Sequence, residues 1–415
     1  MIKIEDKTKC CGCNACASRC PKQCITLQED AEGFRYPVID MALCIDCGVC
    51  ERVCPVIHPG EERTPLQAFA AVNPNETIRM QSSSGGVFTI LAEQIIAEGG
   101  VVFGAAFDDN WEVHHTYTET KEGLEVFRGS KYLQSRIESA YQEAEHFLKD
   151  GRKVLFSGSP CQVAGLKRFL RKSYDNLLAV DFICHGVPSP KVWRKYLEEN
   201  FSAQRADAGK NSVLSSSINK VPVITGIAFR DKTLTGWKKY SFVVRGKSAS
   251  KADKNTVLLS GIFYENRYMQ AFLNDLILRP SCYACPSKKG QSGSDITVAD
   301  FWGIEHVLPD LDDDKGVSLL LAHTDKGKEF ISSHVPNCVL VDAAQSLNHN
   351  TAFYKSVSVH PNRTYFFKRL DKMPLSRLID CSLRPSLKVR VKNKIKKLVH
   401  KINNNIWFLS RTRVR

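Results

Sequence analysis

Residues 10–21 read CCGCNACASRCP and residues 44–55 read CIDCGVCERVCP, and these two stretches decide the fold at the start of the chain. Both contain the spacing Cys-x-x-Cys-x-x-Cys-x-x-x-Cys-Pro, which in two-run modules holds a pair of 4Fe-4S clusters. Three thiolates in one tight loop bind three corners of a cluster, and the fourth ligand comes from the other run. The spacing therefore predicts one cluster on Cys10, Cys13, Cys16 and Cys54 and a second on Cys44, Cys47, Cys50 and Cys20.

Structural zinc and disulfide bonds are the alternative uses of these cysteines. Structural zinc prefers two separated pairs of ligands and gains nothing from the third cysteine of each run or from the following proline. Disulfides are disfavoured because Met1–Lys9 is charged and has no apolar signal segment, which indicates a reducing cytoplasm. We expect a dicluster ferredoxin domain over residues 1–58, with the additional Cys11 and Cys24 as spare thiols.

The positive charge of the chain is concentrated at its end. The 415 residues suffice for two or three domains, and their net charge is +14. Eleven Lys or Arg and no Asp or Glu lie in residues 382–415, so no nucleic-acid partner is indicated for the rest of the chain. In the tail, taken as residues 381–415, apolar residues recur every three or four positions between lysines, which predicts a basic amphipathic helix.

Such a helix is typical of a protein that docks on an anionic membrane surface or on an acidic partner. Packing of the helix on the chain's own body is the open alternative. No run of eighteen uncharged apolar residues predicts a membrane span. We therefore expect a cytoplasmic protein, which would lie peripherally at the inner face of the membrane if its tail binds lipid.

The middle of the chain alternates strand and helix patterns after a linker at 59–66 that contains two prolines and a glycine. Periodicity predicts helices over 87–97, 137–148, 162–171 and 191–201 and strands over 101–107, 153–157 and 177–183. This alternation favours a parallel sheet in residues 67–201. Residues 202–380 are expected to form the second part of the same catalytic region, with antiparallel strands at 226–230 and 240–245. The predicted fold is an α/β domain with a mixed sheet after a small ferredoxin domain.

Four further cysteines are candidate metal ligands, and the predicted topology brings two of them together. Cys161 follows one strand at the start of a helix, and Cys184 follows the next parallel strand, so both lie at the carboxyl edge where open α/β sheets bind ligands. Cys282 and Cys285 have metal-ligand spacing. Together the four would hold a third 4Fe-4S cluster. A lone reactive thiol at Cys161, zinc on Cys282 and Cys285, and unrelated buried cysteines stay open at this point.

Three motifs that would indicate other cofactors or reactions are missing from the sequence. The sequence contains no Gly-x-Gly-x-x-Gly of the ordinary dinucleotide fold, no phosphate loop of the NTPase kind and no Cys-x-x-x-Cys-x-x-Cys of radical adenosylmethionine enzymes. Iron-sulfur clusters carry single electrons, so two-electron chemistry requires a converter, and flavin is the common one.

Six segments, in order, are similar to those of a known family. They are Ser83-Ser84-Gly85-Gly86, Gly129–Ser135 (GSKYLQS), Gly158–Gln162 (GSPCQ), Cys184–Ser189 (CHGVPS), Cys282-x-x-Cys285 and Asp300–Gly303 (DFWG). Together they resemble the family of beta subunits of coenzyme F420-reducing hydrogenase and formate dehydrogenase, and the likeness runs from about residue 67 to about residue 306. The resemblance implies FAD with a 4Fe-4S cluster beside it, and so favours the third cluster on Cys161, Cys184, Cys282 and Cys285.

The resemblance also suggests roles for the residues of these segments. The backbone of Ser83, Ser84, Gly85 and Gly86 would approach a flavin or a substrate phosphate, and Lys131 would stabilise the reduced flavin. The cofactor would be oriented by hydrogen bonds from Tyr132, Gln134, Ser135 and Gln162. Trp302 would lie against the flavin ring. Lys131 and Cys161 are the expected catalytic residues, and Arg128 and Arg230 are candidates for binding an acidic substrate. Helix capping by the serine-glycine segment, packing of Trp302 and solvation of the two arginines are the alternatives.

We therefore expect a flavin-binding iron-sulfur oxidoreductase. Electrons would pass between a partner protein such as a ferredoxin, the clusters and FAD, and would be exchanged as a hydride with an organic substrate or a deazaflavin coenzyme. The alternative from another class is an electron-transfer component of a larger redox complex without a substrate of its own.

Overall fold

The computed structural model describes residues 1–202, 223–247 and 256–384. The contacts divide the chain into a unit of residues 1–360 and a unit of residues 361–415. In the second unit, α12 (Arg363–Phe367) packs on α13 (Leu375–Leu383). The expected start of the basic tail at residue 381 needs correction because it falls inside α13, and the predicted amphipathic helix from residue 385 onward lies outside the described residues.

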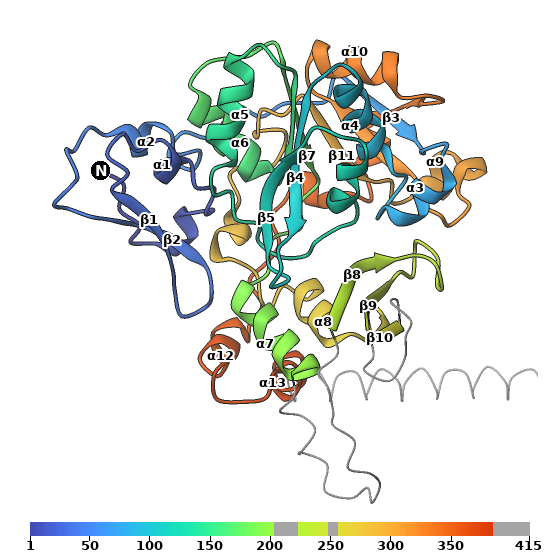
Figure 1. Cartoon of the computed structure of the whole chain (residues 1–415). Helices are drawn as coiled ribbons and strands as arrows, with labels where there is room; N and C mark the ends of the chain where they lie inside the picture. The colour runs from blue at the N-terminus through green and yellow to red at the C-terminus, as the bar shows by residue number, and fades with distance from the viewer. Residues whose placement is uncertain (203–222, 248–255, 385–415) are drawn as a thin grey trace, which may run out of the picture. The chain divides into compact units, whose positions relative to one another are not determined.

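The two cysteine runs fold into a small module (Figure 1). It consists of an antiparallel hairpin of β1 (Ile25–Glu29) and β2 (Arg35–Ile39) and two short helices, α1 (Ala15–Ser18) and α2 (Val49–Arg52). Each run turns on a residue with positive φ immediately before its helix, which is 69° at Asn14 and 65° at Gly48. Gly and Asn tolerate this conformation best. The repeated sequence therefore gives a repeated backbone that gathers three cysteines in each loop.

An eight-stranded mixed sheet forms the centre of the large domain, with the strand order β13-β3-β12-β11-β7-β6-β4-β5. Its strands are β3 (Gln67–Ala71), β4 (Val101–Phe107), β5 (Val113–Thr118), β6 (Val154–Gly158), β7 (Leu177–Phe182), β11 (Ile296–Asp300), β12 (Ser318–Ala322) and β13 (Val339–Val341). Strands β4, β6, β7 and β11 pair in parallel and the other pairs are antiparallel. The predicted mixed sheet is confirmed.

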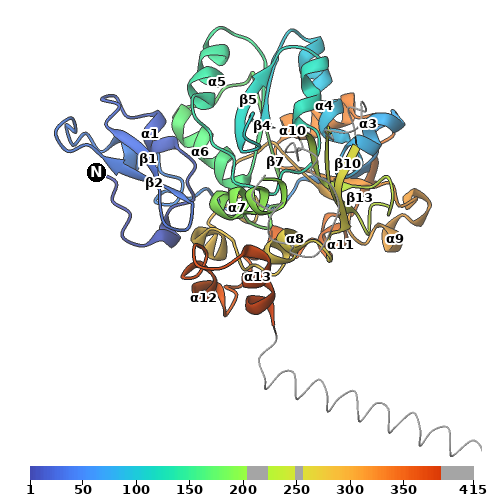
Figure 2. The ribbon, with the colours of Figure 1, turned by 60° about the horizontal axis from the view of Figure 1, so that its bottom comes forward.

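Helices cover both faces of this sheet (Figures 1 and 2). On one face lie α5 (Ala140–Lys149) and α6 (Pro160–Leu170), and on the other lie α4 (Val87–Ala97) and α10 (Asp325–His334). Successive strand residues point to opposite faces: Val154 and Phe156 of β6 join the core beneath α5 and α6, whereas Leu155 joins the core beneath α4. Burial on both faces explains why these strands appear in the sequence as continuous apolar runs.

The remaining elements extend the large domain. They are α3 (Glu76–Gln81), α7 (Pro190–Phe201), α8 (Arg267–Leu273), α9 (Ile304–Val307), α11 (Ala343–Leu347) and a three-stranded antiparallel sheet of β8 (Val223–Asp231), β9 (Ser241–Lys247) and β10 (Thr256–Ile262). The predicted hairpin at 226–230 and 240–245 corresponds to β8 and β9. Trp193 of α7 packs on this sheet, with its ring centre 5.2 Å from that of Phe229. In the described part of the chain, no helix is long and apolar enough to cross a membrane.

Candidate functional site

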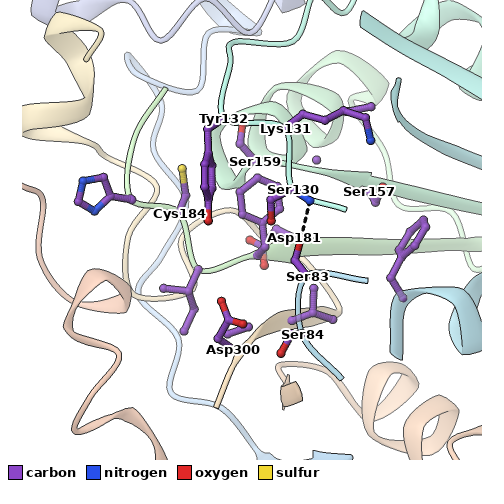
Figure 3. A pocket seen from close by; sticks show the side chains of 18 of the residues that line it. Ser83, Ser84, Ser130, Lys131, Tyr132, Ser157, Ser159, Asp181, Cys184 and Asp300 are labelled. Atoms are coloured by element: carbon purple, nitrogen blue, oxygen red, sulfur yellow. Dashed lines mark hydrogen bonds between the residues drawn. The ribbon is translucent and has the colours of Figure 1, made fainter. Parts of the chain in front are cut away.

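A cavity of about 540 Å³ lies at the carboxyl ends of β4, β6, β7 and β11. This is the sheet edge at which the topology places Cys161 and Cys184, and both residues line the cavity. Figure 3 shows Cys184 there. The other lining residues that the sequence singles out are Ser83, Ser84, Gly86, Arg128, Lys131, Tyr132, Gln134, Ser135, Gln162, Arg230 and Trp302. The cavity therefore gathers nearly all of the expected cofactor residues from separate segments.

The serine-glycine segment joins α3 to α4 and forms one wall of the cavity. Gly86 is the N-cap of α4 with a φ of 81°, in the left-handed region that favours glycine. Ser83 Oγ accepts a hydrogen bond of 2.6 Å from the N–H of Ser130, which ties this wall to a neighbouring one (Figure 3). The ammonium group of Lys232 also fixes the segment, because it donates to the carbonyl of Ser84 at 2.8 Å.

Gly85 is the exception among the expected cofactor residues, because it packs on the sheet. A Cβ at this position would lie 2.6 Å from the carbonyl oxygen of Ala71 and 2.6 Å from the backbone nitrogen of Ser318. Gly85 is also absent from the cavity wall. The missing side chain of Gly85 lets the segment approach β3 and β12, and the expected cofactor contact of its backbone stays a prediction.

Lys131 and Tyr132 form a second wall. Figure 3 shows the Tyr132 ring between Cys184 and Ser130, whereas the Lys131 side chain runs away from Cys184. Lys131 Nζ donates to the carbonyl of Arg128 at 3.2 Å. Desolvation lowers the pKa of Lys131 to about 7, so this side chain can exchange a proton near neutral pH.

Two of the predicted hydrogen-bonding residues already have partners within the chain. Gln162 accepts a hydrogen bond of 3.0 Å from the N–H of Ser159 and donates to the carbonyl of Ser135 at 3.2 Å, which completes a capping box at the start of α6. Gln134 Nε2 donates to the carbonyl of Cys11 at 3.3 Å. Gln162 thus fixes the cavity wall, and Gln134 connects this wall to the ferredoxin module.

A buried arginine presents unused donors to the cavity. The Arg230 side chain is 3% exposed and forms an ion pair with Asp300 through Nη1, but its Nε and Nη2 atoms have no hydrogen-bond partner among the described residues. The rings of Tyr240 and Trp302 are centred 4.5 Å and 5.4 Å from the guanidinium carbon. A desolvated guanidinium with two free donors can bind a carboxylate or a phosphate.

Asp181 is a titratable group of the cavity that the sequence reasoning missed. It lies near the end of β7, is 3% exposed and accepts a hydrogen bond of 2.5 Å from Thr297 Oγ1. Burial raises the pKa of Asp181 to about 6, so it can hold a proton close to neutral pH. The signal in the sequence is a single acid inside the apolar run LLAVDFI at residues 177–183.

The four internal cysteines come together beside this cavity. Cys161 and Cys184 line it, and Cys282 and Cys285 lie close enough to interact electrostatically with Cys161. Burial raises the pKa of Cys282 to about 12 and that of Cys184 well above its usual value. Four thiols in a desolvated site fit an iron-sulfur cluster, because iron stabilises the thiolates that burial alone disfavours.

The ferredoxin cysteines divide into the two sets expected from their spacing. Cys10, Cys13, Cys16 and Cys54 line one small cavity, here called the inner site, and Cys20, Cys44, Cys47 and Cys50 line another, here called the outer site. Among residues 1–202, 223–247 and 256–384, no three His, Cys, Asp or Glu side chains are arranged to hold one metal ion. Neither the ferredoxin cysteines nor the internal cysteines therefore converge on a single metal ion. The ligands of a 4Fe-4S cluster do not need to converge in this way, because each cysteine binds a separate iron.

Cys11, expected to be a spare thiol, lies between the inner site and the internal cysteines. Its thiol is buried, lies beside the thiols of Cys13 and Cys161, and lines the large cavity. Cys11 and Cys13 also belong to the apolar core under α6. The ferredoxin module therefore reaches the wall of the cavity through Cys11.

Two segments of the chain match known protein families. Residues 151–343 match the family described as the C terminus of the coenzyme F420 hydrogenase/dehydrogenase beta subunit, and residues 9–57 match the 4Fe-4S dicluster domain. The F subunit of the F(420)H(2) dehydrogenase of Methanosarcina mazei is 28% identical over 218 residues, which cover 48% of this chain and 61% of that protein. The coenzyme F420-dependent sulfite reductase of Methanocaldococcus jannaschii is 27% identical over 171 residues, 40% of this chain and 26% of that protein.

The ferredoxin region has relatives of its own. In Geobacter metallireducens, the second form of the I subunit of NADH-quinone oxidoreductase is 46% identical over 61 residues, which cover 13% of this chain and 47% of that protein. The chain thus spans less than two thirds of the length of each of these three relatives.

Proposed function

Because the chain belongs to the family of coenzyme F420 hydrogenase/dehydrogenase beta subunits through residues 151–343 and carries a 4Fe-4S dicluster domain at residues 9–57, we propose that it is an iron-sulfur flavoprotein oxidoreductase. Electrons pass between the two ferredoxin clusters, a third cluster and FAD, and are exchanged as a hydride with an organic substrate or a deazaflavin coenzyme. One observation carries this proposal: the wall of the large cavity contains cysteines of both the ferredoxin module and the internal set, namely Cys11, Cys161 and Cys184.

The third cluster is assigned to Cys161, Cys184, Cys282 and Cys285. All four thiols lie near one another, and burial raises the pKa of Cys184, Cys282 and Cys285. Two of the four also border the cavity, so a cluster held here would lie beside whatever the cavity binds. Zinc on Cys282 and Cys285 alone would leave the two neighbouring half-buried thiols of Cys161 and Cys184 without a role.

FAD is assigned to the large cavity. When bound, it would convert the single electrons of the clusters into the two-electron transfer of a hydride. The N–H groups of the segment around Gly86, at the start of α4, suit a phosphate group, and Lys131 and Tyr132 line the same cavity. Trp302, stacked on Trp237 with 4.6 Å between ring centres, gives the cavity a flat aromatic surface that suits a planar ring.

The substrate is proposed to carry an acidic group. Arg230 offers two unused buried donors, whereas the other candidate, Arg128, already donates to Oε1 of Gln81 at 3.0 Å. Asp181, with its pKa raised to about 6, is placed to hold the proton that accompanies hydride exchange. Both side chains line the same cavity as the proposed FAD site.

The electron partner is proposed to be a separate redox protein, such as a ferredoxin, that meets the outer site. Cys47 of this site is exposed, so a partner can approach it closely. The relative from Methanosarcina mazei is named as one of the subunits of a dehydrogenase, which supports a second candidate function: electron transfer within a larger complex, without a substrate of its own. Bound FAD would support the first function, and its absence would support the second.

The cofactor content of protein purified without oxygen tests this proposal. We expect about twelve iron per chain, from three clusters of four, and one FAD that is reduced reversibly together with the clusters. The double variant Cys282→Ser/Cys285→Ser should retain about eight iron. Cys338→Ser is the matched control, because Cys338 packs against the core beneath α4 and α10 and lines none of the three cavities that border the three sets of cysteines, and it should retain about twelve.

Two results would contradict the proposal in different ways. A wild-type chain with about eight iron, unchanged in the double variant, would remove the third cluster. A chain with all its iron but no FAD, even after incubation with the flavin, would leave electron transfer within a larger complex as the function.

A further inference from the structure

A fully buried arginine joins the ferredoxin module to the internal cysteines. Arg279 is 0% exposed and directly precedes the turn of Pro280–Ala284, which carries Cys282. Its Nε donates to the carbonyl of Cys10 at 2.8 Å, and its Nη2 donates to the Sγ of Cys10 at 3.7 Å. Its own carbonyl accepts a hydrogen bond of 2.9 Å from the N–H of Cys282. Arg279 therefore contacts a ligand of the inner site and a ligand of the proposed third cluster.

The remaining contacts of Arg279 hold its guanidinium in one place. Nη1 donates to Oε1 of Gln134 at 3.0 Å and Nη2 donates to the carbonyl of Arg35 at 2.9 Å. The ring of Tyr36 is centred 4.4 Å from the guanidinium carbon. A Cβ on Gly12 would lie 2.9 Å from this carbon, so the glycine between Cys11 and Cys13 makes room for the arginine.

The charge of Arg279 has no carboxylate counterpart. Within the described residues, its hydrogen bonds go to backbone carbonyls, an amide and a sulfur, and no ion pair with an acidic side chain occurs. A buried cation without a counter-ion is costly. Its neighbours include the thiols of Cys10, Cys11 and Cys282 and the hydroxyl of Tyr36. A 4Fe-4S cluster on four thiolates is an anion, so a cluster at the inner site supplies the missing negative charge.

We propose that Arg279 raises the reduction potential of the inner cluster above that of the outer cluster and so makes the inner cluster the acceptor of electrons that enter at the outer site. Reduction adds one negative charge to the cluster, and a nearby buried cation and an N–H···S hydrogen bond both favour the more negative state. In this step one electron leaves the outer cluster and reduces the inner one, with no proton exchanged and no bond broken.

Among the described residues that line the outer site, none supplies an equivalent buried positive charge. Its arginine, Arg52, donates to the carbonyl of Cys47 at 2.9 Å, but Arg52 is exposed and solvent screens its charge. The onward transfer of electrons to FAD rests on the proposed function, whereas the potential of the inner cluster depends only on the dicluster domain and on Arg279.

Redox titration of the full chain, followed by electron paramagnetic resonance, tests this inference. Cys47→Ser alters the outer cluster and so identifies its signal. In the wild-type chain, the inner cluster should have the higher potential. Arg279→Gln should shift the inner cluster to lower potential and leave the outer cluster unchanged, and Arg279→Lys, which keeps the charge, should recover part of the lost potential. The matched control Arg52→Gln should leave the inner cluster unchanged.

Two results would overturn the inference. One is an inner cluster whose potential in the wild-type chain is equal to or below that of the outer cluster. This comparison tests the inference even if the Arg279→Gln variant loses its iron. The other is an Arg279→Gln variant that keeps its ferredoxin iron and both potentials. Neither result depends on FAD or on the third cluster, so failure of this inference is distinguishable from failure of the proposed function.

Discussion

At the scale of single residues, the charge that Lys131 contributes to the cavity depends on pH. Because desolvation lowers its pKa to about 7, the side chain is charged below that pH and largely neutral above it. A nearby cation favours the anionic reduced flavin, so Lys131→Ala should lower the FAD potential in the acidic range and have little effect in the alkaline range. One charge at a partly screened distance contributes on the order of 1 kcal/mol, and a two-electron couple shifts by about 30 mV per ~1.4 kcal/mol. The expected drop is thus a few tens of millivolts.

Spectroelectrochemical titration of bound FAD at about pH 6 and about pH 9 measures this difference. Lys131→Arg is the control, because arginine stays charged at both values, and its FAD potential should exceed that of the wild-type chain at the higher pH. An FAD potential that Lys131→Ala leaves unchanged at both values, with FAD still bound, would place this ammonium group away from the flavin ring.

Which residues the sequence could identify depends on how far their partners lie along the chain. The ferredoxin cysteines form a local motif, so their spacing alone singles them out, whereas the serine-glycine segment is identified through its resemblance to a family. Arg279 belongs to no motif, and the carbonyl that accepts from its Nε lies 269 positions away, on Cys10. Gly85 belongs to a motif, but the atoms that leave no room for a side chain there lie on β3 and β12, and the motif gives no sign of them.

At the scale of elements, α6 is the helix that supports the ferredoxin module, and Gly165 allows its close approach. A Cβ on Gly165 would lie 2.7 Å from Tyr141 Oη and 2.9 Å from the Cβ of Cys13. Alanine is favoured over glycine inside a helix by about 1 kcal/mol, but overpacking a core costs about 1–3 kcal/mol. We therefore expect Gly165→Ala to lower the Tm of the anaerobic protein and to weaken retention of the inner cluster.

Thermal unfolding and iron analysis of Gly165→Ala measure these effects. Gly261→Ala is the control, because a Cβ on this residue of β10 would meet nothing within 4 Å, and it should leave both the Tm and the iron content near the wild-type values. A higher Tm for Gly165→Ala, as helix propensity alone would give, would mean that the ferredoxin module does not pack tightly on α6.

The elements themselves were predictable where local sequence decides them. The helix over 87–97 and the strand over 101–107 have the expected bounds, because Gly99 and Gly100 separate them. The helix expected from residue 137 begins only at Ala140, because Glu138 has a φ of 49° and interrupts the turn. Strands β3 and β12 were not identified, since each is short and they pair across about 250 residues of chain.

At the scale of the whole molecule, most of the excess positive charge lies in residues 385–415, which hold ten Lys or Arg and no Asp or Glu. The composition of this segment predicts docking on an anionic membrane surface or on an acidic partner. A basic residue near an anionic surface contributes about 1 kcal/mol, and this attraction falls off within a Debye length of roughly 8 Å at physiological salt. Docking through this segment should therefore depend steeply on salt.

Deletion of residues 385–415, which leaves α13 (Leu375–Leu383) intact, tests this role. The shortened chain should keep its iron, its FAD and its activity with an artificial electron donor, but should lose salt-sensitive binding to vesicles of anionic lipid in a co-sedimentation assay. A full-length control in which Lys392, Lys394, Lys396, Lys397 and Lys401 are changed to Gln keeps the apolar residues and should lose most of the same binding. If the shortened chain instead unfolds or releases its cofactors, the segment belongs to the folded core, because a docking arm can be removed without loss of stability.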